Sequence, residues 1–206
     1  MRTIRQAGSA ELVAKKSRFL CVLRRVDSES RAREFVARCR KEHPNARHHC
    51  YAYVVGDDAE VQKSNDDGEP SGTAGMPILR ALHHNELTNT AAVVVRYFGG
   101  VLLGSGGLIR AYGTATGRAL EEVGLVRREP ARMVSIAVDH STAGRLDNEL
   151  RAAGYEPADT RYGALVEFDV AVPEPDTAAF ERWIGEAAGG DARVSPGERT
   201  FLEVAE

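Results

Sequence analysis

The chain has 206 residues, of which 43% are hydrophobic and 28% are charged, proportions typical of a globular protein that buries one or two cores. No apolar run approaches the roughly 18 residues that a membrane helix needs, and the N-terminal stretch lacks the apolar segment of a signal peptide. Fibrous, disordered and membrane-spanning classes are therefore excluded, and we expect a soluble, cytoplasmic protein.

The formal net charge of −3 conceals an asymmetry between the two ends of the chain. Residues 1–130 carry 20 Lys and Arg against 15 Asp and Glu, a net of +5, whereas residues 131–206 carry 7 against 15, a net of −8. Pro130 stands where a helical pattern ends and an alternating strand pattern begins. The sequence therefore predicts two domains, 1–130 and 131–206, with different partners.

Alternating and helical hydrophobic patterns predict an α/β first domain. The first predicted elements are a strand over 18–26 and a helix capped by Asp27 or Ser28, whose buried face consists of Ala32, Phe35, Val36 and Cys39. A strand over 48–55, a polar loop over 62–75, a helix over 76–84 and a strand over 90–97 follow. After a glycine-rich turn, the last predicted element is a helix from about 108 to 122.

The second domain has the strand and helix order of a ferredoxin-like fold. The predicted elements are strands over 132–138, 155–162 and 165–172, a helix capped by Ser141 and ended by Gly154, a helix over 176–188 and a last strand within 193–204. The order βαββαβ in 76 residues is the split βαβ plan. We therefore expect an α+β protein overall.

Cysteine and histidine residues give little support for a metal or disulfide. Cys21, Cys39 and Cys50 are odd in number and form no CxxC pair, which argues against a disulfide framework and a cysteine-rich zinc site. His48 and His49 are adjacent on a predicted strand and so point to opposite faces. We assign no metal site, no cofactor and no catalytic residue.

Two glycine-rich segments interrupt the periodic pattern and are the candidate sites. Each leads into a predicted helix, where free backbone amides and close approach at glycine can hold an anion. The predicted anion or nucleic-acid contact loop comprises Arg96, Gly99, Gly100, Gly104, Gly106, Gly107 and Arg110. The neighbouring loop comprises Asp66, Asp67, Gly68, Glu69 and Ser71.

Standard motifs do not account for these segments, and several interpretations stay open. Ser105 stands where a Walker A motif requires Lys, and the spacing of the glycines does not fit a dinucleotide-binding fingerprint. The glycines could serve tight turns alone, and the acidic residues could hold Mg²⁺ or form a solvated turn. A run of arginines between residues 24 and 47 is either a solvated helix face or a footprint for nucleic acid or an acidic partner.

Four strings in the first domain resemble the IMPACT/YigZ family: KKSRF (15–19), HHCYAYV (48–54), DDGEPSGTAGMPIL (66–79) and VVVRYFGGVLLGSGGLIRAYG (93–113). Asn65 departs from the Ser usual before DDGEP. The resemblance implies a two-layer α/β first domain like the second domain of a small-subunit ribosomal protein. It also implies a second domain like the last domain of elongation factor G.

The same resemblance implies a connection with translation. Eukaryotic members are linked to translation control under stress, but they carry a further partner-binding domain that we do not expect in these 206 residues. Bacterial members have no settled biochemical activity. We expect a non-enzymatic regulator of translation that binds RNA, the ribosome or a translation factor. The alternatives are an enzyme or binder acting on a phosphorylated metabolite or nucleotide through the same loops, and a protein–protein adaptor that docks through the acidic domain.

Overall fold

The computed structural model describes residues 1–205 and divides the chain into two compact units, Met1–Arg127 and Arg128–Val204. Both units combine strands with helices, so the predicted α+β class is confirmed. Strand β7 (Leu125–Val138) continues through Pro130, which lies between the residues that pair with β1 and those that pair with β9. No helix within residues 1–205 is long and apolar enough to cross a membrane.

The first unit is built on an antiparallel sheet in the order β2-β3-β6-β4-β5. These strands are β2 (Gly8–Ala14), β3 (Ser17–Arg25), β4 (His48–Val55), β5 (Val61–Asn65) and β6 (Thr90–Tyr97). A short strand, β1 (Arg2–Ile4), pairs with the first three residues of β7. Strand β6 is central, and its neighbours β3 and β4 both run antiparallel to it. The first residues of β3 and β4 therefore lie beside the last residues of β6.

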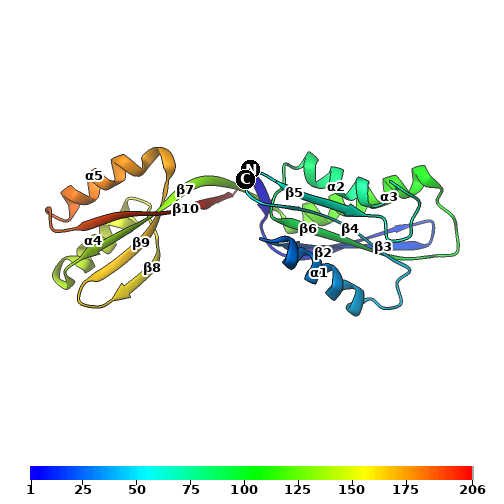
Figure 1. The fold of residues 1–206 in the computed structure, drawn as a ribbon, viewed down its shortest axis with the longest axis horizontal. Coiled ribbons are helices and arrows are strands. Elements are labelled where there is room, and N and C mark those ends of the chain that lie inside the picture. Colours follow the sequence, from blue (N-terminus) through cyan, green and yellow to red (C-terminus); the bar gives the residue numbers. More distant parts are fainter. Residues whose placement is uncertain (206) are drawn as a thin grey trace. The chain divides into compact units, whose positions relative to one another are not determined.

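Helices cover both faces of this sheet: α1 (Glu29–Glu42) lies on one face, and α2 (Gly75–His84) and α3 (Ser105–Val123) lie on the other (Figure 1). Alternate residues of β6 accordingly enter two cores, with Val93 in the core beneath α1 and Val94 in the core beneath α2 and α3. The unit has three layers, where the family resemblance implies two.

Several boundaries differ from the predictions, each for a local reason. Strand β5 occupies part of the predicted polar loop, because an exposed edge strand with mostly polar residues shows no alternation. Strands β1 and β2 were not predicted. Helix α3 begins at Ser105 rather than near 108, because its first turn contains glycines that conceal the helical pattern. The Ser28 cap of α1 is confirmed, since its side chain accepts a hydrogen bond from Arg31 N.

The second unit has the predicted βαββαβ order. Its elements are β7, α4 (His140–Ala152), β8 (Pro157–Tyr162), β9 (Val166–Pro173), the short 3-10 helix η1 (Glu174–Asp176), α5 (Thr177–Ala187) and β10 (Arg193–Ala205), and β10 pairs with β7. Leu146 of α4 and Ile184 of α5 share one core with Ile136 and Phe168 of the sheet. Helix α4 begins one residue before the predicted cap Ser141, with Asp139 at the N-cap position.

Candidate functional site

A buried ion pair joins the two glycine-rich segments predicted as the site. Arg96 is on β6, directly opposite His48 of β4 in the sheet register. Its guanidinium Nη1 lies 2.5 Å from Glu69 Oε1, and the two side chains are only 6% and 4% exposed. The structure thus brings together residues 27 positions apart in the sequence. The acidic loop, which the sequence analysis proposed as the neighbour of the contact loop, thus supplies Glu69 as the counter-ion of Arg96.

The carboxylate of Glu69 is held by a further buried network. Tyr112 of α3 donates its hydroxyl to Glu69 Oε1 at 2.8 Å, and Cys50 Sγ lies 3.3 Å from the same hydroxyl. Burial raises the pKa of the Cys50 thiol to about 12 and raises the pKa of Tyr112 well above its usual range. Both groups therefore remain protonated near neutral pH and act as hydrogen-bonding groups rather than as nucleophiles.

Asp66 caps helix α2. Its carboxylate accepts hydrogen bonds from the backbone N–H groups of Gly72, Ala74 and Gly75 at 2.8–2.9 Å. Burial opposes ionisation, but the three amides together outweigh it and lower the pKa of Asp66. Asp66 is thus committed to positioning the turn that carries Glu69.

The next residue, Asp67, ties the same turn to strand β4 and helix α1. Its carboxylate accepts from Arg40 and from the backbone N–H of His49, both at 2.7 Å, and its carbonyl oxygen accepts from His48 Nδ1 at 2.8 Å. No set of three potential metal-ligating side chains gathers anywhere within residues 1–205. The carboxylates of Asp66 and Asp67 are therefore engaged in hydrogen bonds that hold the acidic loop in place.

A cavity of about 340 Å³ opens beside the buried ion pair. It lies between the end of β6, the start of β4 and the N-terminus of α3. Its wall consists of Arg47, His48, Gly68, Glu69, Pro70, Arg96, Phe98, Leu102, Leu103, Gly104, Ser105 and Leu108. Because Nδ1 of His48 donates to a carbonyl, its other ring nitrogen, Nε2, is the one near the cavity wall formed by Glu69, at 3.9 Å from Oε1.

At two of the predicted glycines, Gly99 and Gly104, the geometry of the backbone explains why glycine is present. A Cβ atom at Gly99 would lie 2.0 Å from the backbone carbon of Lys16, so the loop after β6 rests directly on the β2–β3 turn. Gly104 has φ +73°, a conformation that favours glycine, and it turns the chain into α3. Of the two glycines, Gly104 belongs to the wall of the cavity.

The remaining predicted residues lie near the cavity without all lining it. Gly106 and Gly107 belong to the first turn of α3, and Gly100 and Ser71 are exposed. Arg110 lies about one turn further along α3 and lines an adjacent cavity of about 290 Å³ together with Lys15. Leu103 belongs to both cavity walls, so the two cavities adjoin.

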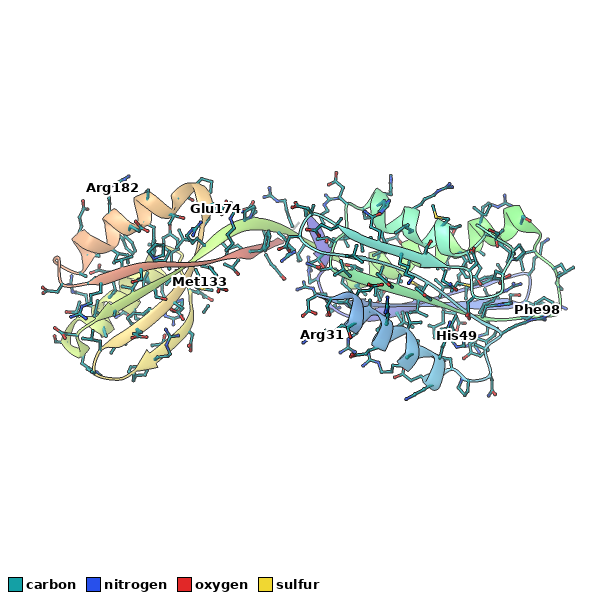
Figure 2. All side chains as sticks on the ribbon, in the orientation of Figure 1. Arg31, His49, Phe98, Met133, Glu174 and Arg182 are labelled. Atoms are coloured by element: carbon teal, nitrogen blue, oxygen red, sulfur yellow. The ribbon has the colours of Figure 1, made fainter. Side chains whose placement is uncertain are left out.

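An exposed basic and apolar surface surrounds these cavities. We call it the tip surface and define it as Lys15, Lys16, Arg47, Phe98, Leu102 and Arg110. Within the part of the chain that the structure describes, none of its four cationic side chains has an acidic partner. Figure 2 shows Phe98 at the end of the first unit where β6 runs into the following loop. The Arg47 guanidinium lies over the Phe98 ring at 5.6 Å.

The arginines of helix α1, in contrast, have acidic partners. Arg31 pairs with Asp27, Arg33 with Glu29 and Arg38 with Glu42, at 3.0, 2.8 and 3.9 Å; Arg40 pairs with Asp67, as described above. The exposed charge of this face is therefore locally balanced. For the arginines on α1 this favours a solvated face, and Figure 2 shows Arg31 well away from Phe98.

Arg47 and Phe98 were not among the predicted site residues, and the sequence placed Arg47 only at the end of the arginine run. Neither residue belongs to a periodic pattern, and each stands just outside a strand. Only the pairing of His48 with Arg96 places them on the same edge of the sheet. The available signal was indirect, namely an arginine before one buried strand and an aromatic residue after another.

Residues 15–120, which contain every residue of the site, match the family described as Impact N-terminal domain. The chain is also 45% identical over 203 residues to the IMPACT family member YvyE of Bacillus subtilis, covering 98% of this chain and 94% of the relative. The chain belongs to the IMPACT family.

Other comparisons extend this IMPACT assignment over both units. The IMPACT family member YigZ of Escherichia coli is 37% identical over 182 residues, covering 87% of this chain and 89% of its own length. Residues 136–191 match a domain family described as of unknown function. A crystal structure of a hypothetical protein, 34% identical, superimposes with a TM-score of 0.62 and covers 94% of this chain and 95% of that one. The predicted family is confirmed, whereas the likenesses to a ribosomal protein and to elongation factor G stay predictions.

Proposed function

We propose that this IMPACT family chain is a translation-associated protein that binds RNA through the tip surface. The observation that carries the proposal is the combination of four cations without acidic partners and an exposed aromatic ring around one pair of cavities. Lys and Arg side chains neutralise phosphates, and aromatic rings stack on unpaired bases. The family's link with translation supports RNA as the polymer.

Apolar exposure distinguishes the tip surface from an ordinary basic patch. Phe98 is 39% exposed and Leu102 is 80% exposed, although both follow a strand that is buried except at its last residue, Tyr97. Stacking of a base on an aromatic side chain contributes about 1–3 kcal/mol and tolerates any sequence. We therefore expect binding of single-stranded RNA with little base preference.

The test is fluorescence anisotropy with a labelled single-stranded RNA at several salt concentrations. We expect affinity to fall steeply as salt rises, because phosphate contacts release counterions. Lys16→Ala and Arg110→Ala should each reduce the salt slope by about 0.7, the contribution of one phosphate contact on a single strand. Arg33→Ala is the matched control, because this exposed arginine is paired with Glu29 on α1.

Two results would contradict the proposal. One is RNA binding that does not respond to salt or is absent at low salt. The other is an equal loss of affinity in Arg33→Ala and Arg110→Ala, which would indicate nonspecific charge rather than a defined surface. Sedimentation of the protein in a ribosome gradient separates ribosomal RNA from free RNA as the partner.

A further inference from the structure

The N-terminus of α3 presents unused backbone donors to the 340 Å³ cavity. The first helical hydrogen bond runs from Leu108 N to Gly104 O, so the N–H groups of Ser105, Gly106 and Gly107 precede the helical ladder. None of the three has an acceptor among the described residues, and Gly104 offers no side chain as a cap. Gly104 and Ser105 line the cavity, and the positive end of the helix dipole favours an anion there.

Arg96 supplies an independent observation on the same cavity. Its side chain is 94% buried and lines the cavity wall, with Nη1 on Glu69 and Nη2 3.4 Å from Ser17 Oγ. Its Nε is a buried nitrogen that has no hydrogen-bond partner within residues 1–205. Leaving a buried donor unsatisfied is costly, and such a group in a native structure points to a partner that arrives from outside.

The charges and directions of the donors indicate which anion fits. Two guanidinium groups, Arg47 and Arg96, stand against one carboxylate, Glu69, so the wall is net positive before the α3 amides are counted. The donors come from three elements: the residue before β4, the end of β6 and the start of α3. A phosphomonoester presents three terminal oxygens to such a set of donors, whereas an internal phosphodiester presents two.

We infer that this cavity binds a terminal phosphate, a phosphomonoester carried by an RNA end or by a free nucleotide. The inference deepens the proposed function and rests on it as far as RNA is the source of the phosphate. Arg47 and the amides of Ser105 and Gly106 hold the phosphate oxygens, and Arg96 contributes its unused donor. Phe98, at the rim, lies where the adjoining base can stack.

The test compares two 3′-labelled RNA decamers of one sequence, one with a 5′-phosphate and one with a 5′-hydroxyl. We expect the phosphorylated decamer to bind about tenfold more tightly, the effect of one or two charge-assisted hydrogen bonds. Ser105→Pro should abolish this preference, because proline at the first helical position removes the amide and is compatible with the helix. Ser105→Ala is the matched control, since it keeps the amide and removes only the hydroxyl.

Further variants separate the cavity from the rest of the tip surface. Arg47→Ala should abolish the preference for the phosphorylated end, whereas Arg110→Ala should weaken both decamers equally. Arg96→Lys retains a cation for Glu69 and loses Nε, so it should also lower the preference. Equal affinity of the two decamers in the unsubstituted protein would overturn the inference and leave RNA binding intact.

Absence of any RNA binding would overturn the proposed function instead, and the cavity is then tested with adenosine monophosphate alone. A saturable rise in the melting temperature that adenosine does not produce, and that Ser105→Pro loses, would support a free nucleotide as the source. No shift with either adenosine monophosphate or inorganic phosphate would overturn the inference.

Discussion

The buried ion pair between Arg96 and Glu69 makes the sharpest stability prediction. Arg96→Ala would leave Glu69, whose side chain is 4% exposed, with the Tyr112 hydroxyl as its hydrogen-bond partner and His48 Nε2 3.9 Å away. Removing one member of a buried pair leaves an uncompensated charge and costs about 3–5 kcal/mol. Tyr112→Phe keeps the pair and removes one hydrogen bond to a charged group, so it should cost about 1.5–3 kcal/mol.

A double variant separates the ion pair from simple loss of packing. Arg96→Ala combined with Glu69→Gln buries no charge, so its cost should fall clearly below the sum of the two single costs. Native-state hydrogen exchange of the β4 and β6 amides measures the free energy of opening in the first unit. Trp183, the one tryptophan of the chain, lies in the second unit, and its fluorescence is the internal control. Additive costs, or a cost of Arg96→Ala below about 1 kcal/mol, would refute the reasoning.

Three further predictions concern the scaffold. Asp66→Asn should lower the free energy of unfolding at pH 7 by about 1 kcal/mol. Because folding lowers the pKa of Asp66, the difference in stability from the unsubstituted protein should shrink as pH falls through and below 3.8. Acid-unfolding curves of both proteins measure this difference, and a difference independent of pH would contradict the prediction. Cys50 is buried and the pKa of its thiol is raised to about 12, so it should react with a disulfide reagent at pH 8 only after denaturation. Rapid labelling of Cys50 in the native protein would contradict this prediction. Gly99→Ala should destabilise by about 1–3 kcal/mol because of its contact with Lys16, whereas Gly113→Ala, which meets no atom within 4 Å in α3, should stabilise by about 0.5–1 kcal/mol; similar denaturation midpoints for the two variants would refute the contact argument.

Continuous apolar runs made some elements predictable to the residue. Strands over 48–55 and 90–97 are found with those limits, because both are mostly buried and rich in Val, Ala and aromatic residues. Strand β5 and the first turn of α3 were not predictable in the same way. Strand β5 is an exposed edge strand without an apolar face, so its sequence shows no alternation. The first turn of α3 contains Gly106 and Gly107, and glycine has a low helix propensity.

The site was predictable as a location rather than as an arrangement. The sequence singled out Arg96 and Glu69 in separate loops, but only the sheet order brings them to 2.5 Å. Charge counting could not distinguish Arg33, which is paired on α1, from Arg110, for which no acidic partner appears among the described residues. Pairing between distant strands decides such questions, and local sequence patterns do not report it.

We propose that RNA contacts the tip surface of the first unit. Ultraviolet crosslinking of the full chain to RNA in cells, followed by mass spectrometry of the crosslinked peptides, tests it most directly. We predict crosslinks at Phe98 and in the peptide that contains Lys15 and Lys16, and their loss in Phe98→Ala. Crosslinks confined to helix α1 or to residues 131–206 would contradict the account.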